Sequence, residues 1–95
     1  MINIIATIAF DQSEIQRAQE KLQRMLLPSR AEKGNIQYLL YQDQTEKGCF
    51  VFYEIWENLN AFEQHKESSH FCQLIEYVNE HAKHVDIKQL SSLDV

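Results

Sequence analysis

Residues 49–56, CFVFYEIW, are the segment that most constrains the fold. β-Branched and aromatic residues dominate it, so it predicts a strand, in which side chains alternate between the two faces of a sheet. One face carries aromatic rings and a carboxylate, from Phe50, Phe52, Glu54 and Trp56. The other face carries Val51, Tyr53 and Ile55. Because both faces are apolar, each needs a covering layer: helices on one side and a second sheet on the other.

The rest of the chain predicts helices for only one of these faces. Apolar patterns predict strands at 2–10, 35–42 and 84–90, and the second of these forms a hairpin with 49–56. Helical periodicity predicts a helix that starts near Ile15 and ends at Pro28, a short helix capped by Asn58 or Asn60, and a helix capped by Ser68 or Ser69. The order βαββαβ predicts an α+β, ferredoxin-like fold with an antiparallel sheet.

The length of the chain bears on how the second face is covered. The 95 residues match the size of one small domain, so we expect a single domain over 1–95. Such a chain has no second sheet of its own to place against the first. We therefore expect a homodimer in which two sheets pair face to face.

Charge and composition argue against several classes of partner. The net charge is −5, so phosphate is repelled and we expect no nucleic acid and no membrane surface as partner. The apolar N-terminus has no basic region and reaches Asp11 early, which predicts a strand instead of a signal peptide or membrane span. Two cysteines do not make a disulfide framework. We expect reduced thiols and a cytoplasmic location.

Glu54 is the least expected residue of the central strand. A carboxylate on an apolar face costs several kcal/mol unless it is paired or neutralised. One interpretation is a structural ion pair with a distant cation, for which the chain offers Arg30, Lys83 and Lys88. The other is a pocket acid, or a group that orients a histidine.

Two histidines lie near the bend between the last two predicted helices. His65 follows Phe62 by three positions, so both face the sheet, and this histidine is either a base near neutral pH or a helix-end residue that caps carbonyls. His70 begins the next helix, where it lines an entrance or serves the helix start. The spacing of His65, His70 and Cys72 matches no familiar zinc pattern, and the chain contains no Gly-rich phosphate loop. We expect no metal and no cofactor.

Three groups of residues together resemble the antibiotic biosynthesis monooxygenase domain. They are Glu32, Gly34, Tyr38 and Leu40; Phe50, Tyr53, Glu54 and Trp56; and Ala61, His65, Ser69, His70 and Phe71. The resemblance extends from about Ile2 to Leu93. It implies a ferredoxin-like fold whose sheets pair into a dimeric α+β barrel. It also implies, as in many members, oxidation of a small molecule without metal, flavin or haem.

The resemblance suits a quinol, polyphenol or enol as substrate and dioxygen as oxidant. A base removes the hydroxyl proton, the anion passes an electron to dioxygen, and the radical pair recombines at carbon; such chemistry needs hydrogen-bond donors and a dry cavity. We expect His65 as the base, Tyr38 and Trp56 as donors to the substrate oxygen, and Glu54 as the group that orients them. The expected substrate-binding residues are Phe52, Phe62, Lys66, His70 and Phe71.

Two other functions stay open from the sequence. The His65–Lys66 pair is similar to a branch of the superfamily that isomerises a phosphorylated product of the autoinducer-2 pathway without oxygen. The third possibility is a small-molecule binding module that keeps the fold without the activity. Haem degradation is disfavoured, because Ala6 or Thr7, His65 and Ile75 stand where haem-degrading relatives carry asparagine, tryptophan and histidine.

Overall fold

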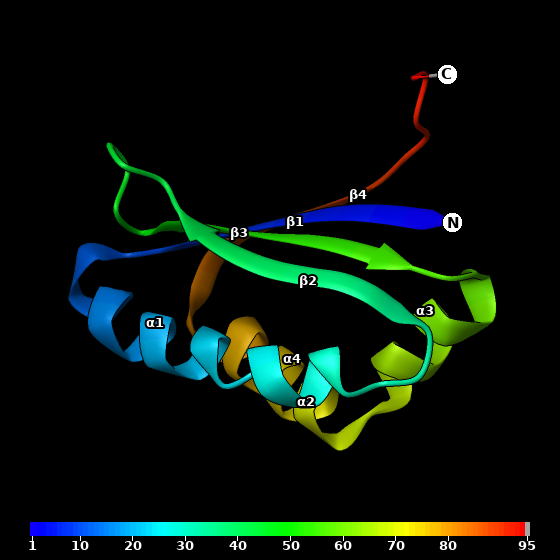
Figure 1. The fold of residues 1–95 in the computed structure, drawn as a ribbon. Helices are drawn as coiled ribbons and strands as arrows, with labels where there is room; N and C mark the ends of the chain where they lie inside the picture. Colours follow the sequence, from blue (N-terminus) through cyan, green and yellow to red (C-terminus); the bar gives the residue numbers. More distant parts are fainter. Residues whose placement is uncertain (95) are drawn as a thin grey trace.

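The computed structural model describes residues 1–94, which form a sheet with helices on one face only (Figure 1). The strands are β1 (Ile2–Phe10), β2 (Asn35–Gln42), β3 (Cys49–Trp56) and β4 (Ala82–Leu90). The helical elements are the 3₁₀ turn η1 (Gln12–Glu14), α1 (Ile15–Gln23), α2 (Leu26–Arg30), α3 (Leu59–Glu67) and α4 (Ser69–His81). The strand order is β2-β3-β1-β4, and neighbouring strands are antiparallel. The predicted α+β, ferredoxin-like fold is confirmed.

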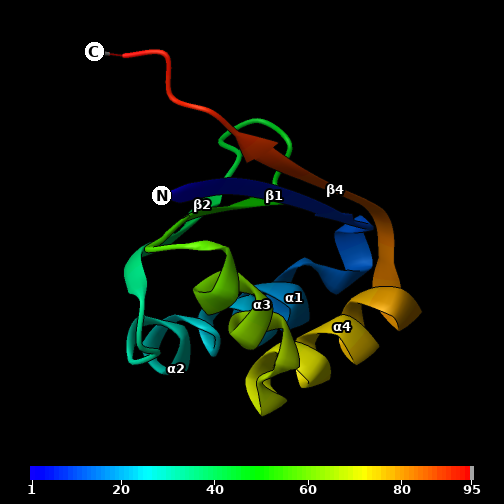
Figure 2. The ribbon, with the colours of Figure 1, turned by 90° about the vertical axis from the view of Figure 1, so that its right-hand side faces the viewer.

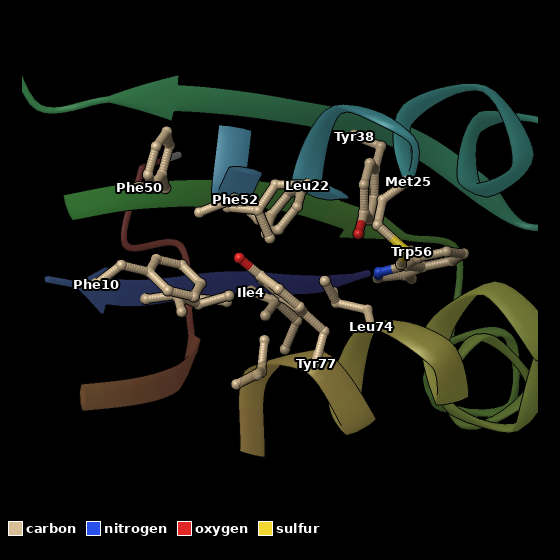
Figure 3. Packing of buried hydrophobic residues seen from close by; sticks show 14 of the residues in the cluster. Ile4, Phe10, Leu22, Met25, Tyr38, Phe50, Phe52, Trp56, Leu74 and Tyr77 are labelled. Atoms are coloured by element: carbon tan, nitrogen blue, oxygen red, sulfur yellow. The ribbon is translucent and has the colours of Figure 1, made fainter. Parts of the chain in front are cut away.

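The core lies between the sheet and the helices, and strand alternation decides which residues enter it. Register pairs Ile4 of β1 with Glu54 of β3, so that every second residue of both strands faces the helices. The largest buried side chains are aromatic and come from β1, β2 and β3: Phe10, Tyr38, Phe50, Phe52 and Trp56. Figure 3 shows these rings packed against Leu22 of α1 and Leu74 and Tyr77 of α4. The predicted grouping of Phe50, Phe52, Glu54 and Trp56 on one face of the strand is therefore confirmed, and this face is the one that meets the helices.

The helix layer differs from the prediction at Pro28. The sequence predicts that this residue ends the first helix, but α1 ends at Gln23 and Pro28 lies inside the short helix α2. Proline is tolerated in the first turn of a helix, because the N–H groups there have no intrahelical acceptor in any case. Because α2 begins at Leu26, the Pro28 ring lies in its first turn.

Of the predicted alternatives, Asn58 caps α3 and Ser68 caps α4. The side-chain oxygen of Asn58 accepts a hydrogen bond from the Ala61 N–H at 2.9 Å, and the Ser68 hydroxyl oxygen accepts one from the Phe71 N–H at 3.2 Å. The same Ser68 hydroxyl donates to the carbonyl of His65 at 2.6 Å. The chain therefore bends at Ser68, and His65 and His70 lie on either side of that bend.

The other face of the sheet carries no covering layer within residues 1–94 (Figure 2). Over β1, β2 and β3 it is largely apolar, and its half-buried side chains include Ile5, Leu39, Val51, Tyr53 and Ile55. At β4 the register turns His84, Asp86 and Lys88 to this face, so its edge is charged. None of the helices in the described part of the chain is long and apolar enough to cross a membrane.

Candidate active site

A narrow cavity of about 50 Å³ lies between the sheet and helices α3 and α4. Its lining is apolar except for Tyr38, Glu54 and Lys66. At the edge formed by β4 it is bordered by Val85 and Ile87, which are 42% and 54% exposed although they point to the helix side. Pockets for small organic ligands usually measure roughly 300–1,000 Å³. A bicyclic molecule therefore fits only if side chains move at this open edge.

Glu54 faces the cavity and is almost fully buried, at 5% exposure. The indole N–H of Trp56 donates a hydrogen bond to its Oε1 at 3.0 Å. Burial raises the pKa of the Glu54 carboxyl to about 7, and the Trp56 hydrogen bond opposes this shift only in part. Such a group is half ionised at neutral pH, which suits an acid–base catalyst.

The ion-pair interpretation of Glu54 is wrong. The Arg30 guanidinium donates to the backbone carbonyl of Tyr38 at 2.9 Å. Lys83 lies 3.8 Å from Asp11, and Lys88 lies 3.7 Å from Asp86, both pairs near the surface. Within residues 1–94 no lysine or arginine comes within ion-pair distance of Glu54. The alternative prediction, a pocket acid, agrees with this environment.

His65 lies directly behind Glu54 and is 1% exposed. Its Nδ1–H donates to Glu32 Oε2 at 2.7 Å, because a carboxylate oxygen can only accept. Nε2 then carries the lone pair; it lies 4.0 Å from Glu54 Oε1 and has no hydrogen-bond partner within residues 1–94. Burial lowers the pKa of His65, although Glu32 opposes the shift, so the ring is neutral at pH 7. An unpaired buried acceptor is thus aimed at the Glu54 carboxyl.

Glu32 joins the two histidines at the bend. His70 Nε2–H donates to the same oxygen, Glu32 Oε2, also at 2.7 Å. The side chains of Glu32 and His70 are 17% and 21% exposed, so this end of the cluster reaches solvent. The residue belongs to the sequence motif that includes Gly34, but the sequence alone suggested no role for it.

Gly34 places the Glu32 loop against α3. Its φ of +89° is in the left-handed region that favours glycine, and a Cβ there would lie 2.6 Å from the Ala61 Cβ. The Gly34 carbonyl accepts a hydrogen bond from the Glu57 N–H at 2.7 Å. This close packing holds the loop that carries Glu32 beside the helix that carries His65.

Tyr38 reaches the cavity from β2, opposite Glu54 in the register of the sheet. Its side chain is buried, and burial together with the neighbouring Glu54 raises its pKa far above the ordinary value. The group stays a phenol at any physiological pH. It is therefore a hydrogen-bond donor and not a base.

Trp56 does not line the cavity, and its only N–H is already given to Glu54. Its ring packs on His65 with centroids 4.5 Å apart, and Figure 3 shows it beside Tyr38 and Met25 at one end of the core. The prediction that Trp56 donates directly to a substrate oxygen does not agree with this geometry. The indole instead holds the Glu54 carboxyl in place.

The cavity brings together six of the residues predicted from sequence: Tyr38, Phe52, Glu54, Phe62, Lys66 and Phe71. His65 and Trp56 stand behind this lining, and His70 lies toward solvent. The predicted residues did not include the other apolar side chains that α4 and β4 contribute to the lining, of which Val85 and Ile87 are examples. The apolar alternation of the last predicted strand was the signal for these two residues.

Lys66 supplies a cation at the cavity wall, and this cation forms an ion pair with Glu63. Its ammonium lies 3.1 Å from Glu63 Oε1 and 4.8 Å from the centre of the Phe62 ring. A phosphorylated substrate would need several free cations. Lys66 is the only lysine or arginine among the described residues that line the cavity.

The ligand atoms of Glu32, His65 and His70 lie within 4.8 Å of one another, and these residue types also bind metals. Both imidazoles, however, point their facing nitrogens at one carboxylate oxygen at 2.7 Å, which is a distance typical of charge-assisted hydrogen bonds. Cys72 is directed elsewhere, with its sulfur 4.0 Å from the Lys66 carbonyl. In this structure the three side chains form a hydrogen-bonded cluster.

Comparison with known proteins identifies similar chains with the same fold. Residues 1–77 match the family described as antibiotic biosynthesis monooxygenase. The solved structure of PA3566 from Pseudomonas aeruginosa superimposes with a TM-score of 0.92 at 31% identity and covers 98% of this chain and 94% of that one.

Two curated sequences are also similar. The Bacillus subtilis protein named "Putative monooxygenase YcnE" is 34% identical over 71 residues, which are 75% of each chain. The uncharacterized protein sll1783 from Synechocystis is 39% identical over 54 residues, which are 57% of this chain and only 37% of that relative. The chain thus matches little more than a third of the Synechocystis protein's length.

Proposed function

This chain belongs to the antibiotic biosynthesis monooxygenase family, and we propose that it oxidises a small aromatic quinol, polyphenol or enolisable compound with dioxygen and without a cofactor. The observation that carries the proposal is the pair of polar groups in the apolar cavity. Glu54 is a carboxyl whose pKa burial raises to about 7, and Tyr38 is a phenol that stays protonated. Together they supply a base and a donor for one substrate hydroxyl.

The proposed reaction starts with proton transfer. The Glu54 carboxylate takes the hydroxyl proton, and the Tyr38 hydroxyl donates a hydrogen bond to the oxygen anion. The anion passes one electron to dioxygen, and the resulting substrate radical and superoxide combine to form a carbon–oxygen bond. The peroxide anion then regains a proton and eliminates water with the hydrogen of the same carbon, which leaves a carbonyl. The dry apolar lining protects the radical pair from water.

The structure changes the roles that we expected from the sequence. His65 was predicted to touch the substrate as its base, but it is enclosed behind Glu54. We assign the first proton transfer to Glu54 and make His65 the acceptor behind it. Trp56 is a positioning residue for the Glu54 carboxyl. Aromatic walls for a flat substrate come from Phe52, Phe62 and Phe71.

The test is oxygen uptake by metal-stripped protein with a panel of dihydroxynaphthalenes and anthrones. We expect uptake above autoxidation that falls about 100-fold in Glu54→Gln, since a general base contributes roughly 10²–10⁴. Glu67→Gln, an exposed glutamate of α3, is the matched control and should keep the wild-type rate. No uptake above the blank would overturn the oxygenase proposal. Turnover of a keto compound under strict anaerobiosis would point instead to an isomerase.

We also propose that two copies pair through the uncovered face of the sheet. That face is largely apolar over β1 to β3, and stable interfaces bury roughly 1,200–2,000 Å² in total. Tyr53→Asp places a charge at its centre and should convert the dimer to a monomer in size-exclusion chromatography. Leu27→Asp, at a residue 79% exposed on α2, should leave the elution volume unchanged. A wild-type protein that elutes as a monomer would contradict the proposal.

A further inference from the structure

The proposed reaction places a proton where it has no direct route to solvent. Glu54 is 5% exposed and His65 is 1% exposed, and the cavity in front of them would be filled by substrate. While the proton stays on Glu54, it can return to the substrate oxygen and end the reaction before dioxygen reacts. A path that removes the proton, and later returns one to the peroxide anion, would prevent this loss.

The side chains behind Glu54 form a continuous series of carboxyl and imidazole groups. His65 Nε2 lies 4.0 Å from Glu54 Oε1; His65 Nδ1 lies 2.7 Å from Glu32 Oε2; and His70 Nε2 lies 2.7 Å from that same oxygen. Each group in the series can accept a proton at one atom and release one at another. Exposure is lowest at His65, at 1%, and rises from there through Glu32, at 17%, to His70, at 21%.

The unpaired Nε2 atom of His65 is the atom of the series that can accept a proton from Glu54. A buried acceptor without a donor is destabilising, and such atoms are rare in folded proteins. A proton on Glu54 would supply the missing donor and would draw the two groups together. The gap of 4.0 Å is therefore the one link that closes only when Glu54 carries a proton.

We propose that Glu32 and His70 complete a proton path from the cavity to the surface, in the order Glu54, His65, Glu32, His70. The inference rests on the proposed function. The proton of the substrate hydroxyl moves to Glu54 and then to His65 Nε2, and the Nδ1 proton moves to Glu32. His70 first exchanges its Nε2 proton for one at Nδ1 through water, which frees Nε2 to accept the proton from Glu32. His70 then releases its Nδ1 proton to water and returns to its starting tautomer. The same path runs in reverse when the peroxide anion takes up its proton, so the enzyme ends each cycle unchanged.

Glu32→Gln tests the path with little change in shape. The amide oxygen still accepts from His65 Nδ1–H, but the amide cannot carry a proton onward. We expect a loss of at least about tenfold in kcat with KM within about twofold of wild type, because Glu32 does not line the cavity. The matched control is Glu14→Gln, since Glu14 also lies beside a histidine of α4 but far from the cavity. An unchanged kcat in Glu32→Gln would overturn the proposal.

His70→Ala tests the outer end of the path by chemical rescue. The variant should lose at least about fivefold in kcat, and added imidazole should restore most of the rate, because the removed side chain was partly exposed. His81→Gln, at the other end of α4, should behave as wild type with and without imidazole. A loss in His70→Ala that imidazole does not restore would mean that His70 has only a structural role.

A measurement without substrate separates this proposal from the proposed function. ¹⁵N NMR on chelator-treated protein should show His65 protonated at Nδ1 in the wild type and in Glu32→Gln. Exchange of that ring proton with water should be at least about tenfold slower in Glu32→Gln and in His70→Phe than in the wild type and His81→Gln. Equal exchange rates in all four proteins would overturn the path even if the enzyme is an oxygenase. Slower exchange in both variants would support it even if no tested compound is oxidised.

Discussion

Two clusters of side chains beside α4 contain similar kinds of residue but differ in their surroundings. One joins Glu32 to His65 and His70 at the start of α4. The other joins Glu14 to Tyr77 and His81 at the end of α4: the Tyr77 hydroxyl donates to Glu14 Oε2 at 2.5 Å, and His81 Nδ1 lies 3.9 Å from Glu14 Oε1. Each cluster is a carboxylate between aromatic or imidazole rings.

The difference between them lies in what surrounds the carboxylate. Glu14 has Arg17 within 3.9 Å, and Lys21 lies 5.7 Å from the centre of the Tyr77 ring, so the charge of that cluster is balanced at the surface. The Glu32 cluster has no lysine or arginine at ion-pair distance within residues 1–94 and continues through His65 toward the buried Glu54. The comparison shows that residue types alone do not make a reactive site. We propose that burial without a neighbouring lysine or arginine is what makes the Glu32 cluster reactive.

The largest expected contrast is in stability above neutral pH. The pKa of Glu54 is about 7 in the folded protein, against 4.5 as its ordinary value, so the folded state binds the proton more tightly. Stability contributed by this group is therefore full below pH 4.5 and is lost as the pH rises through 7. Glu54→Gln never ionises and should be more stable than wild type by about 3 kcal/mol at pH 8, from 1.36 kcal/mol per pKa unit, with little difference at pH 4.

Urea unfolding at both pH values measures this effect. Glu14→Gln is the matched variant and should instead lose about 1–2 kcal/mol at pH 8, because the Tyr77 hydroxyl loses a charged acceptor. A Glu54→Gln variant that is no more stable at pH 8 than wild type would show that the carboxyl is well solvated, and the contrast between the clusters would fail.

The two tyrosines separate catalysis from stability. Tyr38→Phe removes the donor proposed for the substrate anion and should lower kcat about 100-fold, as loss of an oxyanion-hole donor does. Tyr77→Phe should keep kcat within about twofold and lose about 1–2 kcal/mol of stability, since only the bond to Glu14 is removed. Steady-state oxygen uptake gives kcat and urea unfolding gives the free energy of unfolding for each of the two variants. Equal kcat losses would mean that the clusters are not functionally distinct.

A pH profile sharpens the contrast without any substitution. If Glu54 is the base, kcat/KM should rise about tenfold between pH 6 and pH 8, because the ionised fraction of a group with a pKa of about 7 rises by that factor. Glu14→Gln should keep this profile, and Glu54→Gln should flatten it. A wild-type profile that is flat over this range would exclude Glu54 as the group that takes the first proton.

The smallest expected effect concerns the helix starts that carry the two clusters. Asn58 caps α3, which bears His65, through the hydrogen bond from the Ala61 N–H, so Asn58→Ala should cost about 1 kcal/mol. Asp11 precedes the turn that bears Glu14 and makes no side-chain cap bond there, so Asp11→Ala should change stability by less than about 0.5 kcal/mol. Chemical unfolding of both variants checks the difference; equal losses would contradict the assignment of the caps.

The sequence by itself determined the order of strands and helices, apart from the break between α1 and α2, and which side chains share a face of the sheet. Strand alternation over 49–56 placed Phe52, Glu54 and Trp56 on one face, and the short polar side chains of Asn58 and Ser68 marked two helix starts. These features follow from side-chain periodicity and from hydrogen bonds within a few residues, which a sequence displays directly.

Only the tertiary structure decided what these residues meet. Glu32 contacts His65 and His70 across 33 and 38 positions of the chain. Within residues 1–94, none of the cations that the sequence offered comes within ion-pair distance of Glu54. These outcomes depend on how the loop at Gly34 packs on α3 and on how the helices shield the sheet from water. The energies of such contacts depend on burial and on exact separations in space, and no periodicity along the chain carries that information.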